Sequence, residues 1–239
     1  KIMRYSIILF TLLCISCNNN KNDVFQPKIG DILFQDLDSS PLCGAIELVT
    51  NGYKEANLSH IGIVIEGEIP FCNNADERFE EKYFYNLSQD VKILEAIPNK
   101  VRITSLDSFL NRSFDINNNP KVIVGRLKPK YQHTIENAIS FLRSKIGEKY
   151  DDAFMINNNA YYCSELIYEA FQKDSIFTLK PMTFLHPDTK DTLKIWKEYY
   201  SEIGLKIPQN KLGINPGGMS LSEKIDIIHL YGTPKGMQK

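Results

Sequence analysis

The stretch 162–167 reads Tyr-Cys-Ser-Glu-Leu-Ile and places a cysteine directly before a segment with a helical pattern. Apolar residues between Leu166 and Phe171 recur at helical spacing, which predicts a helix over about residues 163–173. A cysteine attacks as its thiolate, and the backbone N–H groups that begin a helix stabilise negative charge. Cys163 is therefore the candidate nucleophile, although a single cysteine more often only fills space in a core.

A second stretch, Ser-His-Ile-Gly-Ile-Val-Ile at residues 59–65, is rich in β-branched residues and predicts a strand that begins with a histidine. His60 is the candidate base, because the other three histidines occupy positions typical of structural or surface residues. Glu95 interrupts the apolar run 93–97, where burying a carboxylate without a partner would be costly. Either Glu95 orients His60 or it points to water from an edge strand, and spacing alone does not separate these alternatives. The other histidines are His133, His186 and His229.

The remaining pattern indicates the α+β class, because a β-rich middle is followed by helical periodicity. Turn residues Gly30-Asp31 open a strand at residues 32–35, and apolar spacing over residues 41–50 predicts a helix. A helix over residues 135–146 ends at Gly147. Further strands are predicted at residues 82–87, 92–97, 101–104, 121–127 and 225–230.

The N-terminal residues have the layout of an export signal. Lys1 and Arg4 precede an apolar run over residues 7–13, which is shorter than the roughly 20 residues that a membrane-spanning helix needs. Ser16 before Cys17 resembles the lipobox of bacterial lipoproteins. We therefore expect residues 1–16 to be a signal peptide, Cys17 to be lipidated and residues 17–27 to form a flexible tether. An ordinary signal peptide or a short buried strand is the alternative.

The chain of 239 residues, 43% of them hydrophobic, fits a single domain over residues 28–239. Its 28 basic and 29 acidic side chains give no strong field for nucleic acid, so no nucleic-acid partner is expected. No His/Cys cluster has metal-ligand spacing, and neither a metal nor another cofactor is expected. In an exported protein Cys43 and Cys72 could pair and leave Cys163 free, which the sequence leaves open.

Five blocks in order resemble the permuted NlpC-type papain-like hydrolases of the YiiX-like group, from residue 28 to about residue 173. They are Gly-Asp-Ile-Leu-Phe-Gln at 30–35, residues 59–64, Leu-Glu-Ala at 94–96, Gly147 with Tyr150-Asp151, and residues 162–167. The resemblance implies a circularly permuted papain-like fold, because His60 precedes Cys163 in the chain. In this fold an antiparallel β-barrel or sheet packs against the helix that carries the cysteine at its N-terminus.

The resemblance implies Cys163 as nucleophile, His60 as general base and Glu95 as the group that orients it. It also implies that Tyr150 and Gln35 bind substrate, with Tyr150 assisting the oxyanion. The expected function is a cysteine amidase or peptidase of the bacterial cell envelope, anchored to the membrane through Cys17, with cell-wall peptides as a natural substrate.

Other substrates and roles stay open. A small molecule, peptide or lipid with an amide or ester bond fits the resemblance, so the alternatives are a lipid acyl amide or ester hydrolase, an acyltransferase, or a non-catalytic lipid-tethered binding protein. Residues 66–83 look long for the group, and the part beyond residue 173 matches poorly; both are expected to shape substrate access. The turn-rich stretch 213–218 is interpreted as a surface loop in preference to a border of the cleft.

Overall fold

The computed structural model describes residues 25–67 and 91–239. The predicted signal peptide, the lipidation site Cys17, the strand predicted at residues 82–87 and Cys72 lie outside the described residues, as does most of the stretch 66–83. The tether predicted at residues 17–27 also lies outside them except for its last three residues.

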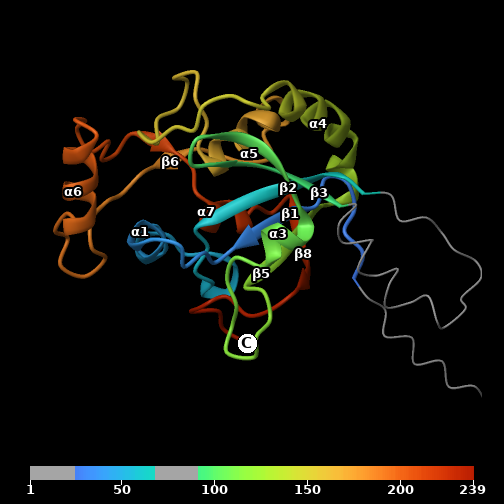
Figure 1. Cartoon of the computed structure of the whole chain (residues 1–239), viewed down its shortest axis with the longest axis horizontal. Coiled ribbons are helices and arrows are strands. Elements are labelled where there is room, and N and C mark those ends of the chain that lie inside the picture. The colour runs from blue at the N-terminus through green and yellow to red at the C-terminus, as the bar shows by residue number, and fades with distance from the viewer. Residues whose placement is uncertain (1–24, 68–90) are drawn as a thin grey trace, which may run out of the picture.

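In the described part of the chain, six strands form one antiparallel sheet in the order β4-β3-β2-β1-β5-β8 (Figure 1). The strands predicted at 32–35, 92–97 and 225–230 are confirmed at those bounds. The strands predicted at 59–65 and 101–104 differ by one residue at both ends, and the strand predicted at 121–127 begins one residue later. Of the two alternatives expected, the antiparallel sheet is confirmed and the barrel is wrong for these residues, because β4 and β8 occupy opposite edges and the sheet does not close. The strands are β1 (Ile32–Gln35), β2 (His60–Glu66), β3 (Lys92–Ile97), β4 (Lys100–Ser105), β5 (Val122–Leu127) and β8 (Ile225–Leu230).

Helices surround this sheet, and the three predicted ones are present with shorter bounds (Figure 1). The helix predicted to reach residue 173 ends at Ala170 and continues as a 3₁₀ turn, and the helix predicted over 135–146 ends at Ser144. The helices are α1 (Pro41–Val49), α3 (Leu106–Leu110), α4 (Ile135–Ser144), α5 (Cys163–Ala170), α6 (Lys194–Glu202) and α7 (Pro216–Ser220). Short 3₁₀ helices cover Tyr53–Glu55, Pro129–Thr134 and Gln172–Asp174, and β6 (Lys180–Pro181) pairs with β7 (Leu212–Gly213).

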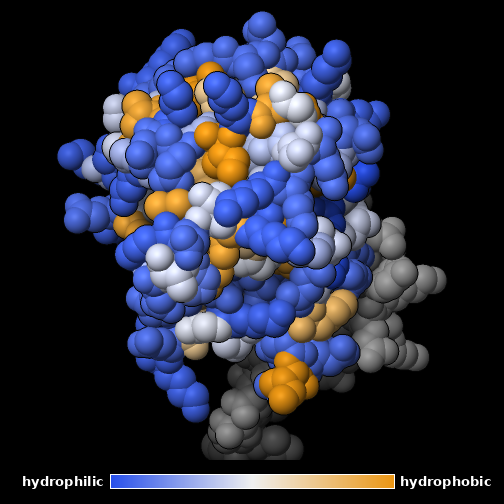
Figure 2. Space-filling model, turned by 90° about the vertical axis from the view of Figure 1, so that its left-hand side faces the viewer, coloured by the Kyte–Doolittle hydropathy of each residue, from blue (hydrophilic) through white to orange (hydrophobic). Residues whose placement is uncertain are grey.

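One end of the molecule has its own small hydrophobic cluster, at the left of Figure 1, where α1 and α6 lie. Ala45 of α1 packs with Phe184 and with Trp196 and Tyr200 of α6. Figure 2 views this end and shows hydrophobic side chains between hydrophilic ones on its surface. No helix in the described residues is both long and apolar enough to span a bilayer.

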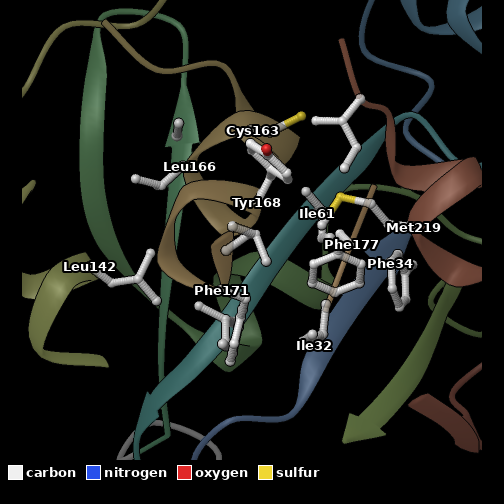
Figure 3. Packing of buried hydrophobic residues seen from close by; sticks show 14 of the residues in the cluster. Ile32, Phe34, Ile61, Leu142, Cys163, Leu166, Tyr168, Phe171, Phe177 and Met219 are labelled. Carbon is white, nitrogen blue, oxygen red and sulfur yellow. The ribbon is translucent and has the colours of Figure 1, made fainter. Parts of the chain in front are cut away.

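The main core lies between the sheet and α4 and α5. Ile61 of β2 belongs to this cluster together with Leu142, Leu166 and Phe171 (Figure 3), and Ile63 of the same strand is also part of it. The opposite face of β2 is also covered, because Val64 and Ile93 pack against Leu106 and Phe109 of α3. Burial on both faces explains why this strand reads as a continuous apolar run instead of an alternating one.

Candidate active site

Cys163 is the first residue of α5, where the extended backbone of Tyr162 turns into the helix. Its side chain is nearly buried, with 8% of the residue exposed, and it lies at the edge of the main core. In Figure 3 the sulfur points away from Leu166 and Phe171. The thiol therefore lies on the side of the helix start that faces away from these core residues, beside the first N–H groups of the helix.

His60 begins β2, opposite Gln35 of β1, and is 5% exposed. Its Nε2 atom lies 2.7 Å from Oε2 of Glu95, which leaves Nδ1 for the sulfur of Cys163. Burial by itself would lower the pKa of His60, but interactions with Cys163 and Glu95 outweigh it and raise this pKa to about 9. The imidazole is thus held between a thiol and a carboxylate.

Glu95 is fully buried on β3, so the alternative in which it points to water is excluded. Its Oε1 accepts hydrogen bonds from Thr104 Oγ1 at 2.5 Å and from Arg112 Nη2 at 2.5 Å, and its Oε2 accepts from Arg112 Nη1 at 2.7 Å. Burial would raise the pKa of Glu95, but the hydrogen bonds with Arg112 and His60 hold it well below its ordinary value. The carboxyl is therefore ionised beside His60.

Arg112 and Thr104 were not found by reading the sequence. The signal available was indirect: a carboxylate inside an apolar strand requires a cationic or hydrogen-bonding partner. Nothing in the spacing distinguishes Arg112 from the other 27 lysines and arginines. It follows α3 closely in the chain, and the fold of that segment brings it to Glu95.

A cavity of about 440 Å³ extends from Cys163 and His60 to the end of the molecule that carries α1 and α6. Cys163, His60 and Tyr150 line this cavity. The other three histidines also belong to the described residues, and none of them lines it. Most of its remaining wall is apolar and includes Leu42, Ile46, Met182, Phe184, Trp196 and Ile214.

Comparison with known proteins places the chain in a family. Residues 26–228 match the family described as permuted papain-like amidase enzymes, YaeF/YiiX. The chain belongs to this family. The match extends well past residue 173, so the C-terminal part that looked dissimilar is part of the family region. As a member of this family, the chain is an enzyme, a cysteine hydrolase of the amidase type that acts on amide bonds.

A solved structure has a similar fold. The crystal structure described as metalloprotein yiiX from Escherichia coli O157:H7 superposes with a TM-score of 0.63, at 19% sequence identity, over 87% of this chain and 99% of that one. At this identity the likeness shows the fold, a permuted papain-like mixture of helices and antiparallel sheet. No curated protein matches the chain significantly in sequence.

The C-terminal part of this YaeF/YiiX-type amidase borders the cavity beside Cys163. The hydroxyl of Tyr162 accepts a hydrogen bond from the backbone N–H of Ile214 at 3.1 Å, and Ser164 Oγ donates to the carbonyl of Ile214 at 3.0 Å. The two neighbours of the cysteine thus fix the segment 213–218, most of which lines the cavity. The interpretation of this segment as a plain surface loop is wrong, because hydrogen bonds of long sequence separation hold it at the site.

The two residues expected to bind substrate lie in different places. Tyr150 lines the cavity, and burial together with nearby Cys163 raises its pKa well above the ordinary value, so its hydroxyl keeps its proton. Gln35 is fully buried and is not among the residues that line the cavity. Its Nε2 donates to the carbonyl of Phe109 at 2.9 Å, while its Oε1 is buried without a partner.

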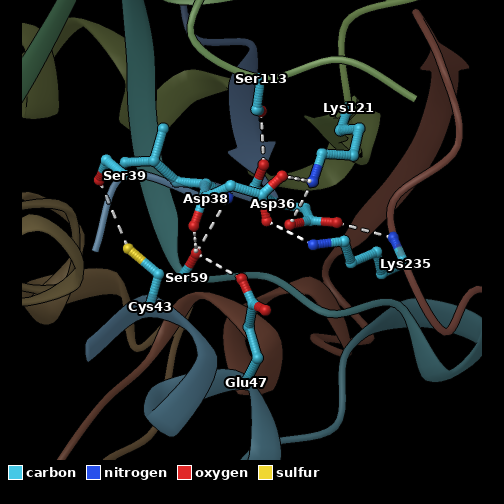
Figure 4. A network of polar contacts seen from close by, with 10 residues as sticks. Asp36, Asp38, Ser39, Cys43, Glu47, Ser59, Ser113, Lys121 and Lys235 are labelled. Atoms are coloured by element: carbon cyan, nitrogen blue, oxygen red, sulfur yellow. Dashed lines mark hydrogen bonds and ion pairs between the residues drawn. The ribbon is translucent and has the colours of Figure 1, made fainter. Parts of the chain in front are cut away.

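A polar network supports the cavity wall behind His60 (Figure 4). Ser59 Oγ donates to Oε1 of Glu47 on α1 at 2.6 Å, which links α1 to the residue before His60. Burial raises the pKa of Glu47 to about 7, although the hydrogen bond from Ser59 opposes the rise. Nearby, buried Lys121 bridges Asp36 and Asp38 at 2.8 and 2.5 Å.

Two cysteines in the described residues, Cys43 and Cys163, carry free thiols, and both line the cavity. The possible Cys43–Cys72 pairing cannot be traced within the described ranges, because Cys72 lies outside them. No group of three or more His, Cys, Asp or Glu side chains in the described ranges has an arrangement that could hold a metal ion.

Proposed function

We propose that this YaeF/YiiX-type amidase cleaves its substrate through an acyl-enzyme on Cys163. The observation that carries the proposal is a chain of three contacting side chains at the start of α5: the thiol of Cys163, the imidazole of His60 and the buried carboxylate of Glu95. A nucleophile, a base and a group that orients the base are the parts that acyl transfer by a thiol needs.

In the proposed reaction Nδ1 of His60 takes the thiol proton, and the sulfur attacks the amide carbonyl carbon. The carbonyl oxygen gains negative charge beside the first N–H groups of α5, and the protonated hydroxyl of Tyr150 assists there. The imidazolium then donates its proton to the leaving amine. Water attacks the thioester carbon, gives a proton to His60 and releases the acid and the free thiol.

The test is the rate of alkylation of Cys163 against pH, followed by mass spectrometry of each modified cysteine. Cys43 is an internal comparator, because its free thiol lines the same cavity and contacts the hydroxyls of Ser39 and Ser40, with no histidine bonded to it among the residues that the structure describes. We expect Cys163 to react at neutral pH, below the free-thiol pKa of about 8.5, and to lose this advantage in His60→Ala. Equal alkylation of Cys43 and Cys163, or amidase activity that survives Cys163→Ala, would contradict the mechanism.

The cavity wall favours a substrate with an apolar acyl group over a cell-wall peptide. Cell-wall peptides carry carboxylates and amines that need polar partners once they are buried. Apart from His60, Asp152 and Lys180 are the ionisable Asp, Glu, Lys or Arg side chains among the described residues that line this wall, and both residues are exposed. A cavity of about 440 Å³ accommodates an acyl chain or a bulky apolar side chain.

A matched substrate series tests this preference. N-acyl amides of increasing chain length, with one leaving amine throughout, are compared with a muropeptide carrying a similar scissile amide. We expect kcat/KM to rise with chain length, because each buried methylene contributes about 0.8 kcal/mol. If kcat/KM does not change with chain length and the muropeptide is cleaved rapidly, the cell-wall peptide is the favoured substrate instead.

We further propose that the enzyme works in the bacterial cell envelope, anchored through a lipid on Cys17. The support is the sequence pattern of residues 1–17 alone. Metabolic labelling with an alkyne fatty acid, comparing wild type with Cys17→Ser, tests it after cell fractionation. Equal labelling of the two proteins, or a wild-type protein found in the cytosolic fraction, would refute the anchor.

A further inference from the structure

We propose that Arg112 is a positioning residue of the active site, which clamps both oxygens of Glu95 and thereby aims the carboxylate at His60. The inference rests on the proposed roles of His60 and Glu95. Neither the family assignment nor the sequence pattern singles out Arg112.

The geometry is a two-pronged clamp. Nη2 of Arg112 lies 2.5 Å from Oε1 of Glu95, and Nη1 lies 2.7 Å from Oε2. That Oε2 atom also contacts Nε2 of His60 at 2.7 Å, so the imidazole and the guanidinium share one carboxylate oxygen. A planar guanidinium that binds both oxygens fixes the rotation of the carboxylate, which a single hydrogen bond does not do.

Arg112 is itself held in place from the face of the sheet that α3 covers. Its guanidinium carbon lies 5.1 Å from the ring centre of Phe109, in a cation–π contact. Gln35 Nε2 donates to the carbonyl of Phe109, and Ser113 Oγ donates to the carbonyl of Asp36 at 2.5 Å. Gln35 therefore holds the segment that carries Arg112, so the role of this buried amide is to support the active site from behind.

The surroundings of Glu95 make the clamp necessary. His60 faces Glu95 from β2, and Thr104 and Arg102 face it from β4, with Arg102 Nε 4.0 Å away and its side chain 46% exposed. Arg112 is 19% exposed and is the cation that binds Glu95 directly. The titratable or charged side chains around His60 are Cys163, Glu95 and Arg112, and Nη1 of Arg112 lies 3.5 Å from Nε2 of His60. Without Arg112, burial favours a protonated Glu95 that no longer stabilises the imidazolium.

The experiment compares Arg112→Gln and Arg112→Lys with wild type, and uses Arg102→Gln as the matched control, because Arg102 is a second arginine near the carboxylate but lies 4.0 Å from it. Two readouts need no substrate: the acid limb of Cys163 alkylation against pH, and the titration of His60 by NMR. In Arg112→Gln we expect the acid limb to move up by one pH unit or more, which makes alkylation at pH 5 about tenfold slower. Arg112→Lys keeps the charge but loses the fork, so it should fall between Arg112→Gln and wild type.

Further outcomes decide between a positioning and a purely structural role. Arg102→Gln should leave both curves in place. If Arg112→Gln does not fold by circular dichroism, Arg112→Lys alone carries the test. Variants that fold and lose thermal stability while keeping wild-type curves would overturn the proposal. A wild-type Cys163 that reacts as an ordinary thiol would instead refute the proposed function, so the two failures are distinguishable.

Discussion

Nε2 of His60 lies 2.7 Å from Oε2 of Glu95, and the carboxylate thereby selects which ring nitrogen faces the thiol. In the neutral imidazole, Nε2 carries the hydrogen and donates it to Glu95, which leaves the lone pair on Nδ1 toward Cys163. When Nδ1 takes the thiol proton, the buried carboxylate stabilises the positive ring. The predictions below start from this contact.

Glu95→Gln should lower kcat by about 100-fold or more, because a neutral amide neither fixes the tautomer nor stabilises the imidazolium. KM should change little, since Glu95 is buried behind His60 and does not line the cavity. Steady-state kinetics of an N-acyl amide measure this, with circular dichroism to confirm folding. A variant within twofold of wild-type kcat would remove Glu95 from the mechanism.

The pH dependence should separate hydrolysis from alkylation on the alkaline side. The raised pKa of His60, about 9, means that the imidazolium loses its proton as the pH rises through that value. Amide hydrolysis needs this proton for the leaving amine, so kcat/KM should fall above about pH 9. Alkylation needs only the thiolate and should stay on its plateau in the same range. Parallel loss of both rates would exclude His60 as the proton donor.

Ile46→Asn should weaken the binding of apolar substrates, because Ile46 lines the cavity from α1. Loss of this apolar surface corresponds to about a tenfold rise in KM, with kcat nearly unchanged. Leu48→Asn is the matched control, since Leu48 lies on the same helix, is 44% exposed and does not line the cavity. Equal KM values for the two variants would argue against binding at this wall.

Glu47 should make the fold less stable as pH rises. Its pKa is raised from 4.5 to about 7, so the folded state binds more protons than the unfolded state between these values. Its stabilising contribution is complete below about pH 4.5 and is lost as pH rises through about 7. Glu47→Gln should therefore gain about 1 kcal/mol over wild type between pH 5 and pH 8, after allowance for solvent screening.

Urea unfolding of both proteins at the two pH values measures this difference. Thr50→Val, which removes a hydroxyl bonded within α1, is the control and should shift stability equally at both values. A wild-type to Glu47→Gln difference that does not change with pH would show that Glu47 is ionised in the folded protein.

Gly62→Ala should destabilise the fold by about 1–3 kcal/mol through overpacking. A Cβ on Gly62 would lie 2.6 Å from Cγ2 of Ile93 and 2.9 Å from Cε2 of Phe109. Gly44→Ala is the control: apart from its chain neighbours and the backbone of α1, no atom of the described residues lies within 4 Å of the added Cβ, and alanine favours the α1 helix by about 0.5–1 kcal/mol. Opposite shifts in melting temperature are expected, and a neutral Gly62→Ala would contradict the packing of α3 on β2.

Local patterns predicted much of the fold. Strands β1, β3 and β8 follow from short apolar runs, and helix α1 follows from helical spacing within its own residues. The closed barrel was wrong because closure depends on whether two distant edge strands meet, which no local pattern records. Segment 213–218 was misplaced for the same reason, since its position depends on Tyr162 and Ser164 about fifty residues earlier.

The residues of the candidate site also fall into those that local sequence predicted and those whose role depends on distant partners. Cys163, His60 and Glu95 each stood out within their own segment, and the structure brings all three together. Arg112 did not stand out, because an arginine in a polar turn looks like any exposed cation until its distant partner is known. Gln35 belongs to one of the blocks that carry the family resemblance, but the sequence does not show that its amide faces Phe109 and not the cavity.

The cavity has two walls with different anchors. Ile214 is fastened to both neighbours of Cys163, whereas Ala45, Phe184, Trp196 and Tyr200 form a cluster apart from the main core. We therefore expect mutations of side chains in this cluster to disturb the nucleophile less than mutations around Ile214. Directed evolution toward new acyl groups should find its beneficial changes on the α1–α6 wall, and a library built around Ile214 should yield mostly inactive enzymes.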